Sequence, residues 1–219
     1  MIRLDAVEAR VVGSLIEKQL TTPGQYPLTA NALVLACNQS SNREPVVSYS
    51  EDEVAAALDR LRERKLARFV LPSHGRSVVR YRHVLDEVLG LSQQELALVA
   101  VLLLRGRQTV GELRARTERM AAFADLDDVE RQLERLAERE EPLVSRLARR
   151  PGQKEERWTE LLGPGTAETH DDATTDDSGE EVRPAPSTFN DLSAEVAALR
   201  GEVSELRAAL EALQASLGG

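Results

Sequence analysis

The chain has 219 residues, of which 42% are hydrophobic, 30% charged and 3% aromatic. This composition supplies enough apolar side chains for one large domain or two small ones, and it excludes a collagen-like chain. The single cysteine, Cys37, excludes an internal disulfide and gives no sign of an oxidising compartment. We expect a cytoplasmic protein that does not enter the membrane, because the first ten residues include four charged side chains and the longest apolar run has only nine residues.

The net charge of −9 comes entirely from the C-terminal tail. Residues 1–160 contain 25 basic and 25 acidic residues, whereas residues 161–219 contain 3 basic and 12 acidic ones. A neutral body exerts no general attraction on nucleic acid, so any contact with DNA has to depend on local basic patches.

Three helices are expected in residues 1–90. The first carries an apolar stripe that runs from Leu4 to Ile16. The second follows Thr29, and the third follows Ser50, which forms a capping box with Glu53. Each of these residues can satisfy backbone N–H groups at a helix start, so we expect the helices to begin there.

The third helix is followed by two predicted strands at residues 67–71 and 77–83, joined by a turn. Three helices followed by a β-hairpin is the element order of a winged helix. Residues 91–162 predict the same order a second time, with helix starts at Ser92, Thr109 and Asp125 and strands over 143–148 and 154–161.

A sequence repeat supports this interpretation. The capping and apolar positions from Ser50 to Leu61 recur 75 residues later, and those from Leu66 to Tyr81 recur 77 residues later. A register that changes only once over thirty residues indicates one supersecondary unit used twice. We therefore predict a mainly α protein with small β-hairpin wings (class α+β), with winged-helix domains at residues 1–90 and 91–162.

The tail has two expected parts. Residues 163–190 are rich in Gly, Pro, Thr and Asp and predict a disordered acidic linker. Residues 191–219 carry apolar side chains at alternating spacings of four and three, which predict a coiled-coil helix. Valine at position a with leucine at position d favours a parallel homodimer, although a single amphipathic helix lying on the body remains the alternative. The proposed dimer contacts are Leu192, Val196, Leu199, Val203, Leu206, Leu210 and Leu213.

The sequence offers little for catalysis. No two of the three histidines share a helix face, and no phosphate-binding loop or nucleophile motif is present. Cys37 follows Ala36 at the end of an apolar stripe and is better explained as a small buried residue than as a reactive thiol. We expect a protein that is not an enzyme and that needs no cofactor or metal.

The charged residues of the two units support opposite conclusions about DNA binding. Both third helices begin with acidic residues (Glu51 to Glu53, and Asp127 with Asp128), which phosphates would repel. Both hairpins are basic and could anchor phosphates, as could three arginines near the second helix of the second unit, although the arginines could equally balance nearby glutamates. The basic residues are Arg76, Arg80, Arg82, Arg146, Arg149, Arg150 and Lys154 in the hairpins, and Arg114, Arg116 and Arg119 near the helix.

One connection is unusually long and polar. Residues Asn38–Pro45 separate the second and third helices of the first unit, where a helix-turn-helix needs only three or four residues. Amides, hydroxyls and a guanidinium can contact base edges, phosphates or a partner backbone, but they can also cap helix ends. The candidate contacts are Asn38, Gln39, Asn42 and Arg43.

Three long motifs resemble the YceH family of uncharacterised bacterial proteins. They are TTPGQYPLTANALVLACNQSSNREPV (Thr21–Val46), RGRQTVGELRARTERMAAFADLDDVE (Arg105–Glu130) and RRPGQKEERW (Arg149–Trp158). The resemblance covers residues 2–162 and implies two tandem winged-helix domains, often with a coiled-coil tail. It implies no activity and no role for the motif residues Asn38 to Pro45, and the acidic linker lies outside the shared pattern.

Two functions remain open. The first is a dimeric DNA-binding or transcription-associated regulator, because paired winged helices suit two half-sites; this preference rests on analogy of fold. The alternative is a protein-interaction scaffold that makes no DNA contact, which suits the neutral body and the acidic third helices. DNA and a protein are thus the two partner classes that the sequence proposes, besides a second copy of the chain.

The coiled-coil prediction is testable by a helix-breaking substitution. Leu206→Pro places a residue without a backbone N–H in the middle of the seam, so we expect a monomer in place of a dimer. Light scattering of the full chain measures the mass. An unchanged mass would contradict the coiled coil.

Overall fold

The structure is a computed structural model that describes residues 2–71, 78–149 and 155–164. Residues 165–190 of the predicted linker and the whole predicted coiled coil lie outside these residues, and so do Arg76, Arg150 and Lys154. The described elements are α1 (Ala6–Thr21), η1 (Pro23–Gln25), β1 (Leu28–Thr29), α2 (Ala30–Cys37), α3 (Glu51–Glu63), β2 (Ala67–Val70), β3 (Arg80–His83), α4 (Leu85–Leu89), α5 (Gln93–Arg105), α6 (Val110–Thr117), α7 (Leu126–Ala137), β4 (Val144–Leu147) and β5 (Arg157–Glu160).

The helices begin at the predicted capping residues. Ser50, Ser92 and Thr109 each form a full capping box, in which the glutamate three residues later accepts from the cap's own backbone N–H. Thr29 and Asp125 cap α2 and α7 through the side chain alone. Local chemistry therefore fixes where these helices start, as the sequence predicts.

Two small antiparallel sheets complete the mixed α and β architecture. The hairpins β2–β3 and β4–β5 confirm the predicted strand pairs. In the first half, β1 adds a third strand, which pairs with β3. The second half has an isolated bridge between Gln108 and Trp158 at the corresponding place, just before the cap of α6. The sequence did not predict β1, because two residues are too few to show a periodicity.

The internal repeat is visible in the core. Val54, Leu58 and Leu61 of α3 are buried, and so are their counterparts 75 residues later in α7, Val129, Leu133 and Leu136. The strands β2 and β3 correspond to β4 and β5 at the predicted step of 77 residues. Helix α4, which was not predicted, follows the first hairpin and leads to α5.

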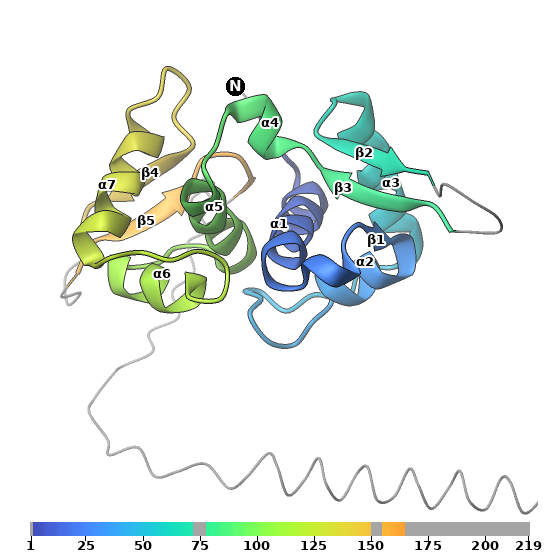
Figure 1. The fold of residues 1–219 in the computed structure, drawn as a ribbon, viewed down its shortest axis with the longest axis horizontal. Helices are drawn as coiled ribbons and strands as arrows, with labels where there is room; N and C mark the ends of the chain where they lie inside the picture. The colour runs from blue at the N-terminus through green and yellow to red at the C-terminus, as the bar shows by residue number, and fades with distance from the viewer. Residues whose placement is uncertain (1, 72–77, 150–154, 165–219) are drawn as a thin grey trace, which may run out of the picture. The chain divides into compact units, whose positions relative to one another are not determined.

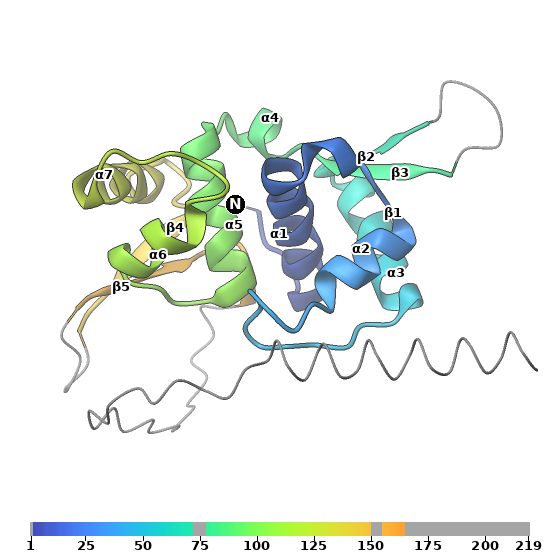
Figure 2. The same cartoon turned by 60° about the horizontal axis from the view of Figure 1, so that its bottom comes forward.

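Two helices, α1 and α5, lie at the centre, between the other elements of the two halves (Figure 1). They run side by side, as a second view also shows (Figure 2). Residues 8–17 of α1 and residues 96–104 of α5 are all buried, so each helix is covered on every side. The nine-residue apolar run of the sequence is thus a core helix, and no described helix is long and apolar enough to cross a membrane.

Gly13 allows α1 and α5 to approach each other closely. A Cβ atom at this position would lie 2.9 Å from Cγ of Leu104 and 3.2 Å from Cβ of Leu103. Both atoms lie near the α5 backbone and cannot move without repacking the interface. Glycine is therefore required here by contact between the helices.

Backbone hydrogen bonds also join the halves. The N–H of Leu4 donates to the carbonyl of Leu162 at 2.6 Å, and the N–H of Glu44 donates to the carbonyl of Leu104 at 2.8 Å. One continuous hydrophobic cluster includes residues of both halves. The predicted boundary near residue 90 thus separates two repeats that share a core.

Substituting alanine at two helical glycines is expected to change stability in opposite directions. Gly13→Ala should lower the free energy of unfolding by about 1–3 kcal/mol, because the added methyl group overpacks the interface. Gly111→Ala in α6 should be neutral or raise it by about 0.5 kcal/mol, since its Cβ would meet nothing closer than 3.9 Å. Urea unfolding of the full chain measures both, and equal effects would contradict the close packing at Gly13.

Candidate interaction surfaces

The polar loop Asn38–Pro45 is fastened from inside by two buried arginines. Arg10 donates to the carbonyl of Cys37 at 3.1 Å and to that of Pro45 at 2.6 Å, and it is 4% exposed. Arg43, also 4% exposed, donates to the carbonyl of Ala36 through Nε at 3.1 Å and Nη2 at 2.8 Å. Both cations therefore lie at the C-terminal end of α2, where the last carbonyls carry partial negative charge.

Glu17 of α1 completes this arrangement with a two-pronged ion pair. Its carboxylate accepts from Nη1 of Arg43 at 3.0 Å and from Nη2 at 2.6 Å. Burial alone would raise the pKa of Glu17, but the hydrogen bonds and charge of Arg43 outweigh it and hold that pKa below its usual value. Burial lowers the pKa of Arg10, and the nearby charge of Arg43 lowers it further.

The structure assigns most of the predicted loop contacts to the fold itself. Asn38 joins the start of the loop to the segment before α3, because its amide donates to the carbonyl of Tyr49 and accepts from the N–H of Tyr49, both at 2.8 Å. The side-chain amide oxygen of Gln39 accepts from Lys18 at 3.3 Å and from Arg43 at 3.1 Å. The prediction of Arg43 as an external contact is therefore corrected: its guanidinium is buried and satisfied internally.

Asn42 differs in exposure from the other candidate contacts of the loop, Asn38, Gln39 and Arg43. It is exposed, with a positive φ of 59°, and its side-chain oxygen accepts from Arg105 of the second half at 2.8 Å. Asn42 thus ties the loop to α5 while remaining at the surface.

The third helix of the first half presents a mainly acidic surface. The exposed residues of α3 are all acidic or alanine: Glu51, Asp52, Glu53, Ala55, Ala56, Asp59 and Glu63. The two arginines in the last turn of this helix are already engaged. Arg60 binds Asp5 at 2.7 Å, and Arg62 binds Asp59 at 2.6 Å and stacks over Phe69 at 3.5 Å.

The hairpin arginines are largely neutralised by neighbouring groups. Arg146 lies among Glu130, Glu134 and Glu156, at 2.6, 3.2 and 3.2 Å, and over the ring of Trp158. In the first hairpin, Arg82 binds Glu87 at 2.7 Å.

Arg80 and Arg149 are further exposed arginines of the hairpins. Arg80 donates to the carbonyl of Pro27 at 2.8 Å. Arg149 lies on the surface at the end of the described part of the second hairpin.

Cys37 is buried, as its apolar setting predicted. Burial raises the pKa of the thiol to about 11, so the thiol is protonated at neutral pH and is a poor nucleophile. His83 is also buried, and burial lowers its pKa to about 4. Among the residues that the structure describes, no group of three or more His, Cys, Asp or Glu side chains could hold a metal ion.

Sequence reasoning missed the roles of Arg10 and Glu17. Both are charged residues beside the apolar stripe of α1, where a helix with one buried face would expose them to water. Their burial follows from the packing of α5 on the far side of α1. The available signal was the position of Arg10 and Glu17 at the two ends of the mostly apolar segment Val11–Ile16.

These observations define the class as a mixed α and β protein, in which two related helix and hairpin units share one core. A family model described as "Protein of unknown function, DUF480" matches residues 4–153. A UPF0502 protein of Pelobacter propionicus is 52% identical over 206 residues, which cover 93% of each chain. The UPF0502 protein YceH of Escherichia fergusonii is 46% identical over 220 residues, 98% of each chain.

A UPF0502 protein of Geobacter sulfurreducens is 55% identical over 161 residues, which cover 74% of this chain and 73% of that protein. The chain belongs to the UPF0502 family, which includes YceH, and this confirms the resemblance drawn from the three motifs. The matches to Pelobacter and Escherichia include most of residues 163–219, so the shared region is longer than the expected 2–162.

The ion pair between Glu17 and Arg43 predicts a strong loss of stability when one partner is removed. Glu17→Gln leaves a buried, uncompensated guanidinium and should lower the free energy of unfolding by about 3–5 kcal/mol at pH 7. Replacing both residues with methionine should restore most of this loss, because no charge is then left buried. Glu118→Gln, at an exposed position, is the surface control and should stay within about 0.5 kcal/mol.

The same pair predicts a pH dependence. The folded-state pKa of Glu17 is lowered, so its stabilisation is complete above the unfolded pKa of about 4.3 and is lost as the pH falls through the folded value. Urea unfolding from pH 7 down to pH 3 should show this loss in the native chain and not in Glu17→Gln. Parallel curves for the two proteins would contradict the assignment.

Proposed function

We propose that the chain is a non-enzymatic, cytoplasmic protein-interaction module built from two tandem winged-helix domains. The order of three helices and a hairpin in each half supports the winged-helix assignment. The single observation that supports the interaction role is the acidic exposed face of α3, on which Arg60 and Arg62 are already paired with carboxylates.

The third helix of a winged helix reads DNA by donating hydrogen bonds to base edges and by lying close to phosphates. Guanine presents two acceptors in the major groove, and carboxylates and alanines cannot donate to them. The carboxylates of Glu51, Asp52 and Glu63 would also be repelled by the phosphates. The same face complements a basic protein segment, which supplies donors and opposite charge.

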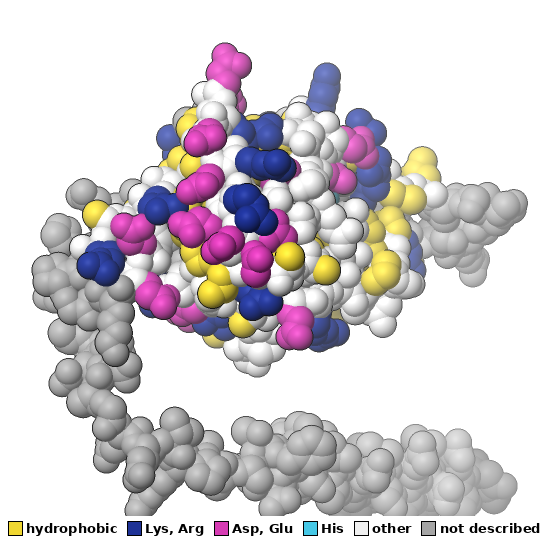
Figure 3. All heavy atoms as spheres, turned by 60° about the vertical axis from the view of Figure 1, so that its left-hand side comes forward, with side chains coloured by type: hydrophobic (Ala, Val, Ile, Leu, Met, Phe, Trp, Pro, Cys, Tyr) yellow, Lys and Arg dark blue, Asp and Glu magenta, His cyan; other side chains and the backbone are white. Residues whose placement is uncertain are grey.

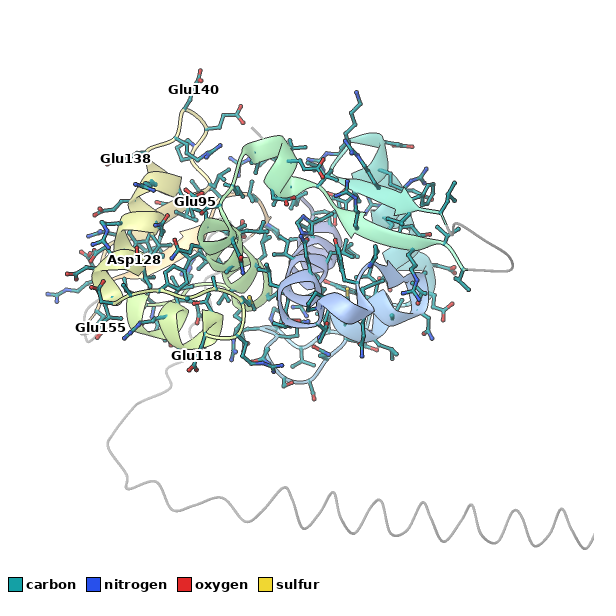
Figure 4. All side chains as sticks on the ribbon, in the orientation of Figure 1. Glu95, Glu118, Asp128, Glu138, Glu140 and Glu155 are labelled. Carbon is teal, nitrogen blue, oxygen red and sulfur yellow. The ribbon has the colours of Figure 1, made fainter. Side chains whose placement is uncertain are left out.

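The second half also presents carboxylates at its surface. Acidic side chains run across the middle of the face shown in Figure 3, with basic side chains beside them. Figure 4 places Asp128 on α7, Glu95 near the start of α5, and Glu138 and Glu140 beyond the end of α7. Arg146 neutralises part of this surface, so α3 is the better candidate for the basic partner.

A DNA-binding regulator is the second candidate, and it corresponds to the function that the fold analogy favours. The exposed guanidiniums of Arg80 and Arg149 support it, as they are suited to phosphate contacts from the hairpins. In this mode the hairpins would hold the DNA backbone and α3 would stay clear of the groove. Pairing through the C-terminal coiled coil would serve either function, since it would double the number of binding surfaces.

NMR titration of the isotopically labelled full chain distinguishes the two functions. A lysine-rich peptide should shift the backbone amides of α3, whereas a random DNA duplex at physiological salt should leave them unchanged. Neutralising three carboxylates (Glu51→Gln, Asp52→Asn, Glu63→Gln) should weaken peptide binding roughly threefold to tenfold. Glu138→Gln, an exposed carboxylate beyond α7, is the matched control and should change little.

Two results would contradict the proposal. One is a peptide that shifts only amides of the acidic tail, because the tail would then be the binding site. The other is a DNA duplex that shifts the α3 amides and binds more tightly to the triple variant, because α3 would then face DNA.

A further inference from the structure

A groove of about 440 Å³ lies between the two halves. It is lined by the C-terminal part of α1, the polar loop after α2, the end of α5, and α6 with the residues that follow it. Val101, Leu104, Ala115 and Met120 contribute apolar lining, and the other lining residues are polar. This volume lies in the range of small-molecule sites.

Four cationic side chains line the groove. Lys18 comes from α1, Arg105 from α5, Arg116 from α6, and Arg119 from the segment after α6. Two carboxylates, Glu17 and Glu118, also line it, but Glu17 is already paired with Arg43 at 2.6 Å. The side chains around the groove therefore leave an excess of positive charge.

The arginines of the groove are only weakly neutralised. Arg105 donates to the neutral amide of Asn42, and Arg116 lies 3.7 Å from Glu112, a loose ion pair. Arg119 makes no hydrogen bond or ion pair within residues 2–71, 78–149 and 155–164. Burial lowers the pKa of Arg105, and the charge of Arg116 lowers it further, because the two cations repel each other.

The C-terminal ends of helices also meet at the groove, and their carbonyls oppose an anion. Two of these carbonyls already accept hydrogen bonds. The backbone carbonyl of Glu17 accepts from the hydroxyl of Thr21 at 2.7 Å, and that of Leu104 accepts from the N–H of Glu44 at 2.8 Å. Each end carries a charge of about −0.5 at most, so three ends do not cancel the excess of the side chains.

We propose that this groove binds a phosphate-bearing ligand between the two halves of the chain. Guanidinium groups match phosphate oxygens in pairs, and three arginines and one lysine line this groove. The phosphate group belongs either to a small phosphorylated molecule or to a nucleic-acid backbone. A ligand held by both halves would also stabilise their association.

Calorimetric titration of the full chain with inorganic pyrophosphate tests the site. Pyrophosphate should bind the native chain, and the double variant Arg116→Gln, Arg119→Gln should raise its Kd by about tenfold or more, because two charge-assisted contacts are lost. Arg135→Gln, on the exposed surface of α7, is the matched control and should leave the Kd unchanged. Absence of pyrophosphate binding, or an equal rise in Kd for the double variant and for Arg135→Gln, would overturn the proposal.

A short DNA duplex identifies the source of the phosphate. Pyrophosphate binding without duplex binding assigns the groove to a small ligand. Duplex binding that pyrophosphate displaces, and that the double variant weakens, assigns it to a nucleic-acid backbone. Duplex binding that neither pyrophosphate nor the double variant affects, in a chain that does not bind pyrophosphate, overturns the site. The α3 substitutions should not alter any of these results, so this test is independent of the proposed protein partner.

Discussion

The close packing of α1 against α5 at Gly13 determines how the rest of the described chain is arranged. Because these two helices are buried on all sides, each half covers one flank of the other half's first helix. Two units of this size would each have a small core and low stability if they were separate. Sharing α1 and α5 gives the two repeats one larger core.

This shared core explains why charged residues occur inside α1. Glu17 and Arg10 would reach water if α1 had a single buried face, but α5 covers the opposite side. The chain satisfies these charges with the end of α2 and with Arg43. The polar loop is consequently part of the framework, and its surface is reduced to residues such as Ser40, Asn42 and Glu44.

The sequence predicted what depends on local chemistry. Helix starts followed from capping residues such as Ser50 and Thr109, and both hairpins and the repeat followed from periodicity. It did not predict β1 or α4, which are two and five residues long and too short to show a pattern. Nor did it predict the cationic groove, because Lys18 and Arg116 are nearly a hundred residues apart and meet only through the packing of α1 on α5.

The candidate functional residues likewise divide into those that local sequence identifies and those that only tertiary packing reveals. Local sequence identified the acidic starts of the third helices and the basic hairpins, which are properties of single elements. Whether a charge is free or paired depends on its spatial neighbours, as Arg146 shows among three glutamates from α7 and the second hairpin. The structure therefore favours α3 and the groove between the halves over the hairpin arginines as candidate binding surfaces.

The central claim is that α1 and α5 make the two halves one cooperative unit. Native-state hydrogen exchange of the full chain at increasing urea tests it most directly, through the slowest amides of α3 in the first half and α7 in the second. We predict that both sets converge on the same opening free energy and the same dependence on urea. A half that opens at lower free energy while the other stays protected would contradict this account.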